Sequence, residues 1–416
     1  MTKKHYNLCG ALVTAAIISA CVPVGGTGSG GNPTPTVLPS PTNSPTPVAA
    51  WGYVGGIPGI SESEADYISL AINRQTGAMA VGFQDQAASG KLSVLGIPLN
   101  GSNWSYLGGQ GISPGVANYV NLKISPNGVM YAAFKNIPTP GSGESGGYAY
   151  VYHYNNTGWD YPTISGIIDP ASISVANNIA LAVPQNNVPY VLYSLGVPST
   201  VENAYLGLSF RDTGGWIKRT FSPAITSDNQ IEFVPNISNN EMYIAFKDGL
   251  SNNSISVYSL QESYTTPVAV GSRGFTYHDV YFVSLAVNSS GIPYVAFEDA
   301  AYNDKLSVMY YNGAGGWQYV GGSPGISAGK AVYVSLMLDL NGNPYVAYQD
   351  LSTGMNGKLV IQRYINNKWS VIAQGISIGQ ANYISLKNNP LTNKPVVAFQ
   401  DVGLGNLLSV MQYTGQ

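Results

Sequence analysis

Few residues of this chain are suited to catalysis. Its 416 residues include three His, of which His5 lies in a basic N-terminal segment. His278 is followed by Asp279, and a paired His and Asp can act as a general base. Adjacent residues of a strand point to opposite faces, however, and no nucleophile motif accompanies the pair. His153 lies in an aromatic run, where we expect the surface of a strand. The sequence therefore predicts that the protein is not an enzyme.

Metal-binding patterns are equally weak. No cluster of His and Cys has the spacing of metal ligands. The segment 339–343, Asp-Leu-Asn-Gly-Asn, is rich in oxygen ligands but lacks the acidic spacing and the terminal Glu of a calcium loop. Because the same place in other copies of the repeat described below is a hairpin turn, we expect a turn here. We predict neither a metal nor a cofactor.

An acidic residue recurs at one place of an internal repeat, at the end of a motif such as Tyr-Val-Ala-Phe-x-Asp. It stands at Asp85, Asp248, Asp299, Asp350 and Asp401, with Asn136 and Leu195 in the two other copies. In three copies a Lys follows across a loop: Lys91, Lys305 and Lys358. An Asp at a strand end can cap the loop through backbone N–H groups and pair with such a Lys. The functional alternative is a ring of polar groups on one face.

An aromatic residue recurs in the same way at the start of the motif Tyr-Val-Ser-Leu. The series is Tyr67, Tyr119, Phe282, Tyr333 and Tyr383, and we align Asn178 and Glu232 with it in the two degenerate copies. These rings would pack between repeats or line a channel mouth. Tyr also offers an apolar face and a hydroxyl, which suit sugar or peptide recognition. The candidate ligand-binding residues are Tyr67, Tyr119, Phe282, Tyr333, Tyr383, Asp85, Asp299, Asp350 and Asp401.

The repeat that positions both series is marked by tryptophan. The six Trp stand at 51, 104, 159, 216, 317 and 369, with spacings of 53, 55, 57, 101 and 52 residues. The longest spacing contains two units, one of which lacks its Trp. Seven units of about 50 residues therefore fill 51–416, and those at Trp159 and Trp216 are degenerate. The repeated Trp is expected to pack within or between units rather than to bind a ligand.

Each unit contains four short runs rich in β-branched and aromatic residues, bounded by Gly, Asn, Asp or Pro, which predicts four strands. Four strands per unit resemble a blade of a β-propeller, which implies an all-β, seven-bladed ring. The longest loop leads into Tyr-Val-Ser-Leu, so we place this strand innermost and the Trp strand outermost. The strand at Trp51 is then expected to complete the last blade and to close the ring, which removes exposed sheet edges.

The N-terminus has the three parts of a secretion signal. Lys3 and Lys4 form a basic head, and an apolar core of 13 residues, 8–20, is too short to span a bilayer. The segment Ile18-Ser19-Ala20-Cys21 resembles the lipobox of bacterial lipoproteins. The resemblance implies a signal peptide over 1–20 and lipidation of Cys21 with a diacylglycerol and often an N-acyl chain. Val22 after the Cys implies outer-membrane sorting if the host is Gram-negative.

Residues 21–50 follow as a Gly/Ser and Pro/Thr/Ser tether that cannot bury a core. Fully extended, this tether reaches roughly 90 Å. Cys9 lies in the predicted signal peptide, so the mature domain has no disulfide. The chain carries 18 Lys+Arg and 21 Asp+Glu, with no basic stripe. Nucleic acid is therefore excluded as a partner.

These features together predict a lipid-anchored, monomeric, non-catalytic propeller of the cell envelope. It would bind a glycan or a protein through the face where the crossing loops emerge. One alternative is a scaffold subunit of an envelope-assembly complex, in which the degenerate units provide a docking patch. Another is a glycan-active enzyme, which would need two facing carboxylates at the channel mouth. In the aligned inner strands the sequence offers only Glu232, with Asp66 beside Tyr67.

Overall fold

The computed structural model describes residues 50–138, 147–160, 176–195, 205–212, 215–221, 231–236, 238–261 and 266–415. All of them belong to the second of two units into which the chain divides, Ala49–Gln416. The predicted signal peptide, the lipidation site Cys21 and all of the tether but Ala50 lie outside the described residues. None of the helices in the described residues is long and apolar enough to cross a membrane.

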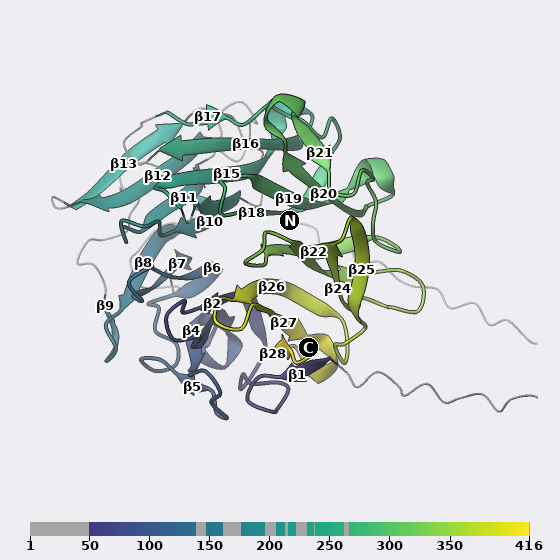
Figure 1. Ribbon diagram of the computed structural model, residues 1–416. Helices are drawn as coiled ribbons and strands as arrows, with labels where there is room; N and C mark the ends of the chain where they lie inside the picture. The colour runs from purple at the N-terminus through teal and green to yellow at the C-terminus, as the bar shows by residue number, and fades with distance from the viewer. Residues whose placement is uncertain are drawn as a thin grey trace, which may run out of the picture. The chain divides into compact units, whose positions relative to one another are not determined.

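The described residues form seven antiparallel sheets of four strands, which we call blades 1 to 7 (Figure 1). Blade 1 contains β2 (Ala65–Ile72), β3 (Met79–Asp85), β4 (Lys91–Ile97) and β5 (Ser105–Tyr106); blade 2 contains β6 (Val116–Ile124), β7 (Met130–Ile137), β8 (Tyr148–Tyr154) and β9 (Trp159–Asp160); blade 3 contains β10 (Ala176–Ala182), β11 (Tyr190–Leu195), β12 (Tyr205–Asp212) and β13 (Gly215–Phe221); blade 4 contains β14 (Ile231–Pro235), β15 (Glu241–Asp248), β16 (Ser254–Gln261) and β17 (Val268–Ala269). Blade 5 contains β18 (Val280–Val287), β19 (Pro293–Asp299), β20 (Lys305–Tyr311) and β21 (Trp317–Tyr319); blade 6 contains β22 (Ala331–Leu338), β23 (Pro344–Asp350), β24 (Lys358–Ile365) and β25 (Lys368–Gln374); blade 7 contains β26 (Ala381–Asn389), β27 (Lys394–Asp401), β28 (Leu407–Tyr413) and β1 (Trp51–Tyr53).

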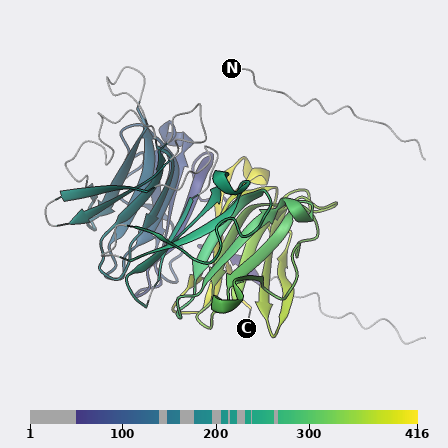
Figure 2. The ribbon, with the colours of Figure 1, turned by 90° about the horizontal axis from the view of Figure 1, so that it is seen from above.

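The first strand of each blade lies innermost. β2 contacts β6 and β26, β10 contacts β6 and β14, and β22 contacts β18 and β26. The inner strands therefore surround a central channel, and a 90° turn of the ribbon shows the strands of neighbouring blades running alongside one another (Figure 2). The seven-bladed β-propeller predicted from the repeat is confirmed.

Ring closure also occurs as predicted. β1 pairs with β28, with Trp51 opposite Tyr413 and Tyr53 opposite Met411. The purple N-terminal strand thus lies beside the yellow C-terminal strand in Figure 1. Blade 7 is built from both ends of the domain, so no blade is left incomplete.

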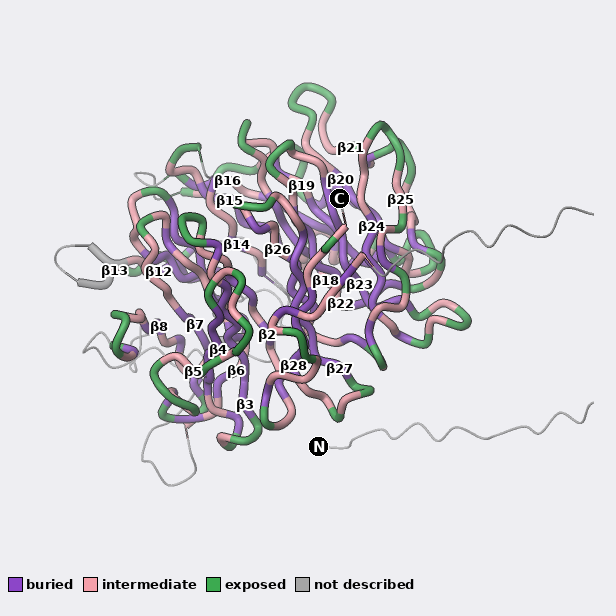
Figure 3. Tube along the Cα trace, turned by 60° about the horizontal axis from the view of Figure 1, so that its bottom comes forward, coloured by how far each residue is buried: buried purple, intermediate pink, exposed green. Residues whose placement is uncertain are grey.

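The core lies between blades rather than on one side of a sheet. Leu70 and Val81 of blade 1 pack against Val396 and Ala398 of blade 7. Ala71 of blade 1 packs instead against blade 2. Because both faces of each sheet are covered, all seven residues of β3 and of β23 are buried. Burial therefore concentrates in the strands and exposure in the loops (Figure 3).

In blades 1, 5, 6 and 7 the Ser of Tyr-Val-Ser-Leu ties the inner strand to the next blade, an interaction that we call the inner clamp. The Ser69 hydroxyl accepts the Leu122 N–H of blade 2 at 2.9 Å, and the Ser335 hydroxyl accepts the Leu386 N–H of blade 7 at 2.9 Å. Ser284 and Ser385 make the same bond, to Leu336 and Leu70. In blade 2 the direction of this hydrogen bond is reversed: the side-chain amide of Asn121 donates to the Ile179 carbonyl of blade 3 at 2.8 Å.

In blades 1, 2, 5, 6 and 7 the repeated Trp ties the outer edge of the blade to the preceding blade, an interaction that we call the outer clamp. Its indole N–H donates to a backbone carbonyl there, with N–O distances between 2.7 and 3.3 Å. The pairs are Trp51–Ile372, Trp104–Val54, Trp159–Leu107, Trp317–Val270 and Trp369–Val320. The side chain of Trp216 is not described. The Trp residues therefore recur once per blade because each of these five makes the hydrogen bond to the preceding blade.

Removing one inner clamp should weaken the ring measurably. Ser335→Ala leaves the buried Leu386 N–H without its acceptor, so we expect the free energy of unfolding to fall by about 1–3 kcal/mol. Urea denaturation measures this change. The control is Ser290→Ala in the exposed turn of blade 5, for which we expect a change within about 0.5 kcal/mol. Equal stability of the two variants would contradict the inner clamp.

Candidate functional site: a cationic cavity in the central channel

The aromatic series surrounds the channel at the end where the crossing loops enter. Tyr67 contacts Tyr119 and Tyr383 with ring-centre distances of 5.2 and 5.4 Å, and Tyr333 contacts Phe282 and Tyr383 at 5.2 and 5.4 Å. Each ring also packs on the core between its own blade and the next. The five rings therefore form one continuous arc over blades 5, 6, 7, 1 and 2.

The backbone explains how these rings come to meet. All five residues have a left-handed backbone, with φ between 48° and 54°, and each lies in a register shift between the first and second strands. Left-handed aromatic residues are rare and cost about 1–2 kcal/mol each. The shift inserts an extra residue and redirects its side chain, as β-bulges do. Aromatic packing around the channel offsets this strain.

The Asp series is placed inside the blades. Asp85, Asp248, Asp299, Asp350 and Asp401 are each at most 3% exposed. In every one, a carboxylate oxygen accepts the backbone N–H two residues later at 2.8–3.1 Å. Asp85 and Asp248 also accept hydroxyl bonds from Ser93 and Ser256. This is the capping arrangement expected from the sequence, whereas ligand binding by the series stays a prediction.

The suggested pairing of this Asp with a following Lys does not occur in the described residues. Lys91, Lys305 and Lys358 lie opposite the Asp in register, but none forms an ion pair with it. Where a cation does reach the Asp, it comes from the crossing loop, as Arg273 reaches Asp248. The Ser hydroxyls of the third strand and nearby backbone N–H groups supply the bonds instead.

The His candidates lie apart from one another and from the channel. His153 of β8 lies 3.4 Å from Asp160 in the outer part of blade 2. Asp279 pairs with Lys247 at 2.5 Å and accepts the Tyr281 hydroxyl at 2.7 Å rather than bonding to His278. Burial would raise the pKa of Asp279, but the bonds from Lys247 and Tyr281 outweigh it and lower the pKa. Among the described residues, no three His, Cys, Asp or Glu gather as a metal site.

A cavity of about 470 Å³ occupies the other end of the channel. Residues from the second halves of six of the seven inner strands, and from the turns that follow them, line its wall. Blade 3 contributes only Val183, Pro184 and Gln185, which follow β10. The cavity therefore opens on the hairpin face, opposite the arc of aromatic rings. None of the nine candidate ligand-binding residues from the sequence is among its lining residues.

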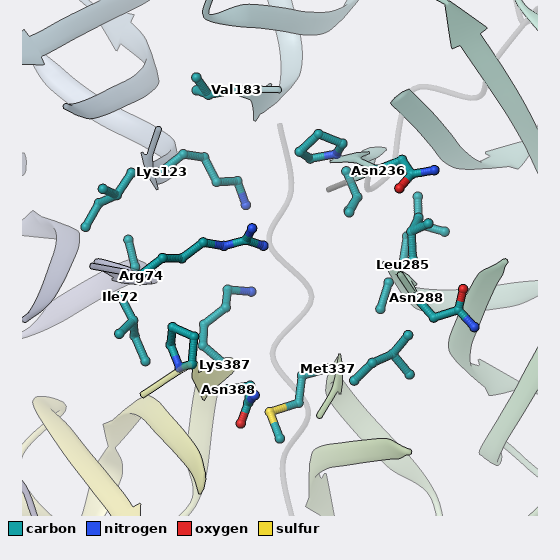
Figure 4. A pocket seen from close by; sticks show the side chains of 18 of the residues that line it. Ile72, Arg74, Lys123, Val183, Asn236, Leu285, Asn288, Met337, Lys387 and Asn388 are labelled. Atoms are coloured by element: carbon teal, nitrogen blue, oxygen red, sulfur yellow. The ribbon is translucent and has the colours of Figure 1, made fainter. Parts of the chain in front are cut away.

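Three cations converge in this cavity: Arg74 after β2, Lys123 of β6 and Lys387 of β26 (Figure 4). They come from the consecutive blades 1, 2 and 7, and their side chains point inward from one side. Leu285, Asn288 and Met337 line the opposite side. The cavity thus has a cationic wall and a wall of apolar and amide groups.

The electrostatics of these groups follow from their surroundings. The side chains of Lys123 and Lys387 are half-buried at the wall of the cavity. Burial lowers the pKa of Lys387 to about 8, and the charge of Lys123 lowers it too, while Glu232 opposes both effects. Burial likewise lowers the pKa of Lys123 and of Arg74. The amino group of Lys387 is therefore mostly charged at pH 7 and loses its charge as the pH rises through about 8.

Glu232 lies two positions away from where the sequence alignment placed it. It pairs with Ala245, as Ser69 pairs with Gly82, so it occupies the inner-clamp position of blade 4 and not the aromatic one. Burial raises the pKa of its carboxyl, and Lys123 and Lys387 oppose that rise. Asp66, the other acid noted beside the aromatic series, accepts bonds from the amides of Gln86 and Gln400.

The sequence analysis missed the three cations, although the repeat contained a signal for two of them. Lys123 and Lys387 stand two residues after the inner-clamp position. The other five blades have Ala71, Ala182, Val234, Ala286 and Met337 there. A Lys at a position that is otherwise apolar departs from the repeat, and such departures could have been searched for.

Neither a protein-family model nor a curated protein sequence matches the chain. Solved structures do share its fold. A polysaccharide lyase described as an ulvan lyase is 10% identical over 85% of this chain and 94% of its own, with a TM-score of 0.55. A prolyl endopeptidase is 12% identical over 84% of this chain and 50% of its own, with a TM-score of 0.51. A lectin of Aleuria aurantia is 14% identical over 78% of this chain and all of its own, with a TM-score of 0.47. At these identities the likeness concerns the propeller fold.

The structural role of the Asp series can be tested at Asp401. Its two oxygens accept the N–H groups of Ile378, Gly379 and Gly403 at 2.8–3.0 Å. Asp401→Ala leaves three donors without a partner, so we expect a loss of about 2–4 kcal/mol in the free energy of unfolding. Asp401→Asn should lose less stability. Asn136 stands at the equivalent position of blade 2, and its side-chain oxygen accepts the Gly115 N–H at 2.9 Å. Thermal denaturation at pH 7 measures both, and wild-type stability of the Ala variant would contradict a structural role.

Proposed function

We propose that the chain is a non-catalytic, envelope-anchored binding propeller that takes a glycan ligand into the cavity on its hairpin face. The observation that carries the proposal is the convergence of three cationic side chains in a cavity to which all seven blades contribute lining residues. Polar groups that converge in a concave site are typical of small-ligand recognition. Asn236, Asn288 and Asn388 add amides to the wall. The Oδ1 atoms of Asn236 and Asn288 accept N–H groups of their own turns, so towards a sugar hydroxyl these two residues would act as N–H donors.

The cavity supports binding rather than hydrolysis. Asp339 is the one acid among its lining residues, and its two carboxylate oxygens accept bonds from Asn341 and Asn343 of its own turn. Glu232 lies deeper in the channel, one residue before the lining residue Phe233. A glycosidase needs two carboxyl groups that flank the scissile bond. The ulvan lyase that shares the fold is a polysaccharide lyase, which is compatible with a glycan ligand, but the proposal rests on the cavity itself.

A glycan array tests the proposal with residues 49–416, the unit that contains every described strand and closes on itself through β1 and β28. We expect a defined set of glycans to bind, and the double variant R74A/K387A to lose this binding. Lys368→Ala, which removes a cation from the exposed outer strand of blade 6, is the matched control and should bind as the wild type does. No binding on the array, or equal binding by the double variant, would contradict the proposal.

The proposed anchor has its own test. Cys21→Ser should abolish palmitate labelling and release the protein from the membrane fraction, because it removes the one thiol at the predicted lipobox. Cys9→Ser changes a thiol in the predicted signal peptide and should leave labelling intact. Since both residues lie outside the unit Ala49–Gln416, neither change should alter its melting temperature. Equal labelling of the Cys21 variant and the wild type would refute lipidation at this site.

A further inference from the structure

The three cations of the cavity are unpaired in the part of the chain that the structure describes. Among the residues that the structure describes, no hydrogen bond or ion pair reaches the side chains of Arg74, Lys123 or Lys387. Glu232 acts on the two lysines through space but makes no ion pair with either. The group therefore has three cationic side chains and at most one negative charge, that of Glu232. Placing like charges together in a partly desolvated site is costly unless a ligand compensates them.

The composition of the chain makes this grouping unusual. The whole chain has 18 Lys and Arg and a formal net charge of −3. Three of these few cations nevertheless meet in one cavity, and two of them replace the small or apolar residues of the repeat. The repeat by itself would build this part of the channel from Ala, Val and Met. The lysines are thus additions to the scaffold and not part of it.

The distribution of groups around the cavity indicates which chemical groups a ligand would need on each side. Lys387, Arg74 and Lys123 come from three consecutive blades and occupy one side. Leu285 and Met337 offer an apolar surface on the other side, next to Asn288. A cationic wall facing an apolar and amide wall fits a ligand with an anionic group on one edge. The rest of such a ligand would present C–H groups and hydroxyls.

We propose that this cavity binds an acidic sugar residue, with its carboxylate or sulfate ester held among Arg74, Lys123 and Lys387. The inference rests on the proposed function and narrows its ligand class. A guanidinium can form two parallel hydrogen bonds to such an anion, while the lysines add point charges. Leu285 and Met337 then contact the apolar face of the sugar ring.

The ionisation of Lys387 agrees with an anion site. Its pKa is lowered to about 8, so its charged form is less stable in the empty cavity than in water. A bound anion favours the charged form, and binding should therefore weaken as the pH rises through about 8. The groups that face Lys387 are Lys123, Glu232 and Arg74. Of these, Glu232, whose pKa burial raises, can only become more negative over the same rise in pH, which also disfavours a bound anion.

Isothermal titration of the unit 49–416 with two matched pairs of probes tests the proposal. The first pair is tetragalacturonic acid and its fully methyl-esterified form, which differ in charge but not in the sugar. The second pair is a sulfated galactose oligosaccharide and its desulfated form. We expect at least one charged probe to bind about ten-fold or more tightly than its neutral counterpart, with affinity falling as salt rises. The pair that responds identifies the source of the anion.

Variants with opposite expected effects sharpen the test. Lys387→Met and Arg74→Gln should each weaken binding of the charged probe about ten-fold or more. Glu232→Gln should strengthen it, because the variant removes the negative charge near the lysines. Lys368→Ala on the outer strand again serves as the control, with unchanged affinity.

Stability separates a binding role of Lys387 from a structural one. A charged group whose pKa is lowered on folding destabilises the fold at any pH below its usual pKa, and fully so below about 8. Lys387→Met should therefore raise the melting temperature at pH 7 while it weakens binding. A structural lysine would lower the melting temperature when replaced.

Several outcomes would overturn the inference. Equal affinity for the charged and neutral probes, with loss of both in R74A/K387A, would overturn the acidic-sugar assignment but leave the glycan-binding function standing. If no sugar bound at all, both the acidic-sugar assignment and the proposed glycan-binding function would be overturned. Binding of inorganic sulfate, without binding of any oligosaccharide, would overturn the assignment to a sugar.

Discussion

The ring depends on hydrogen bonds that most of the blades make to a neighbour at their inner and outer strands. Ser69 and its equivalents hold the inner strands, and Trp104 and its equivalents hold the outer ones. Both clamps use one side chain and one backbone group, so they survive wide variation in the rest of the unit. Apolar side chains then fill the space between sheets whose spacing the clamps have set.

The channel shows how a repeat can carry an individual site. Seven similar inner strands would produce seven similar walls, and a symmetric tube has no preferred place for a charge. Blades 7, 1 and 2 break this symmetry with Lys387, Arg74 and Lys123, and blade 4 does so with Glu232. The blades between them keep small or apolar residues. Specific chemistry thus arises from departures at a few positions of an otherwise regular scaffold.

The sequence predicted the architecture well because the repeat is dense in local signals. Trp spacing, turn residues and the Tyr-Val-Ser-Leu motif led to seven blades, the inner and outer strands and the closing role of Trp51. Two local interpretations were less accurate. The partners of the Asp series are backbone and Ser groups rather than Lys91 and its equivalents. Glu232 was misaligned by two residues, because blade 4 lacks a recognisable Tyr and only its pairing with Ala245 sets the register.

The cavity could not be predicted by the same means. Lys387 lies more than 260 residues from Lys123 along the chain, and only closure of the ring brings blade 7 beside blades 1 and 2. Arg74 lies in a turn after the inner strand, a place that the sequence analysis treated only as a connection. Spacing within one unit does not show which residues of different units face each other across a channel.

Among the described residues of blades 3 and 4, neither of the repeated clamps joins the two blades. Ala180 of blade 3 has no hydroxyl at the inner-clamp position, and blade 4 has Val268 near the place of the outer Trp. A large cluster that includes Tyr190, Phe233 and Phe246 fills this boundary instead. Apolar contact has little directional preference, whereas a hydrogen bond loses strength when its geometry changes. Small shear between these two blades therefore costs less than elsewhere in the ring, and the width of the channel can adjust there, across from its cationic wall.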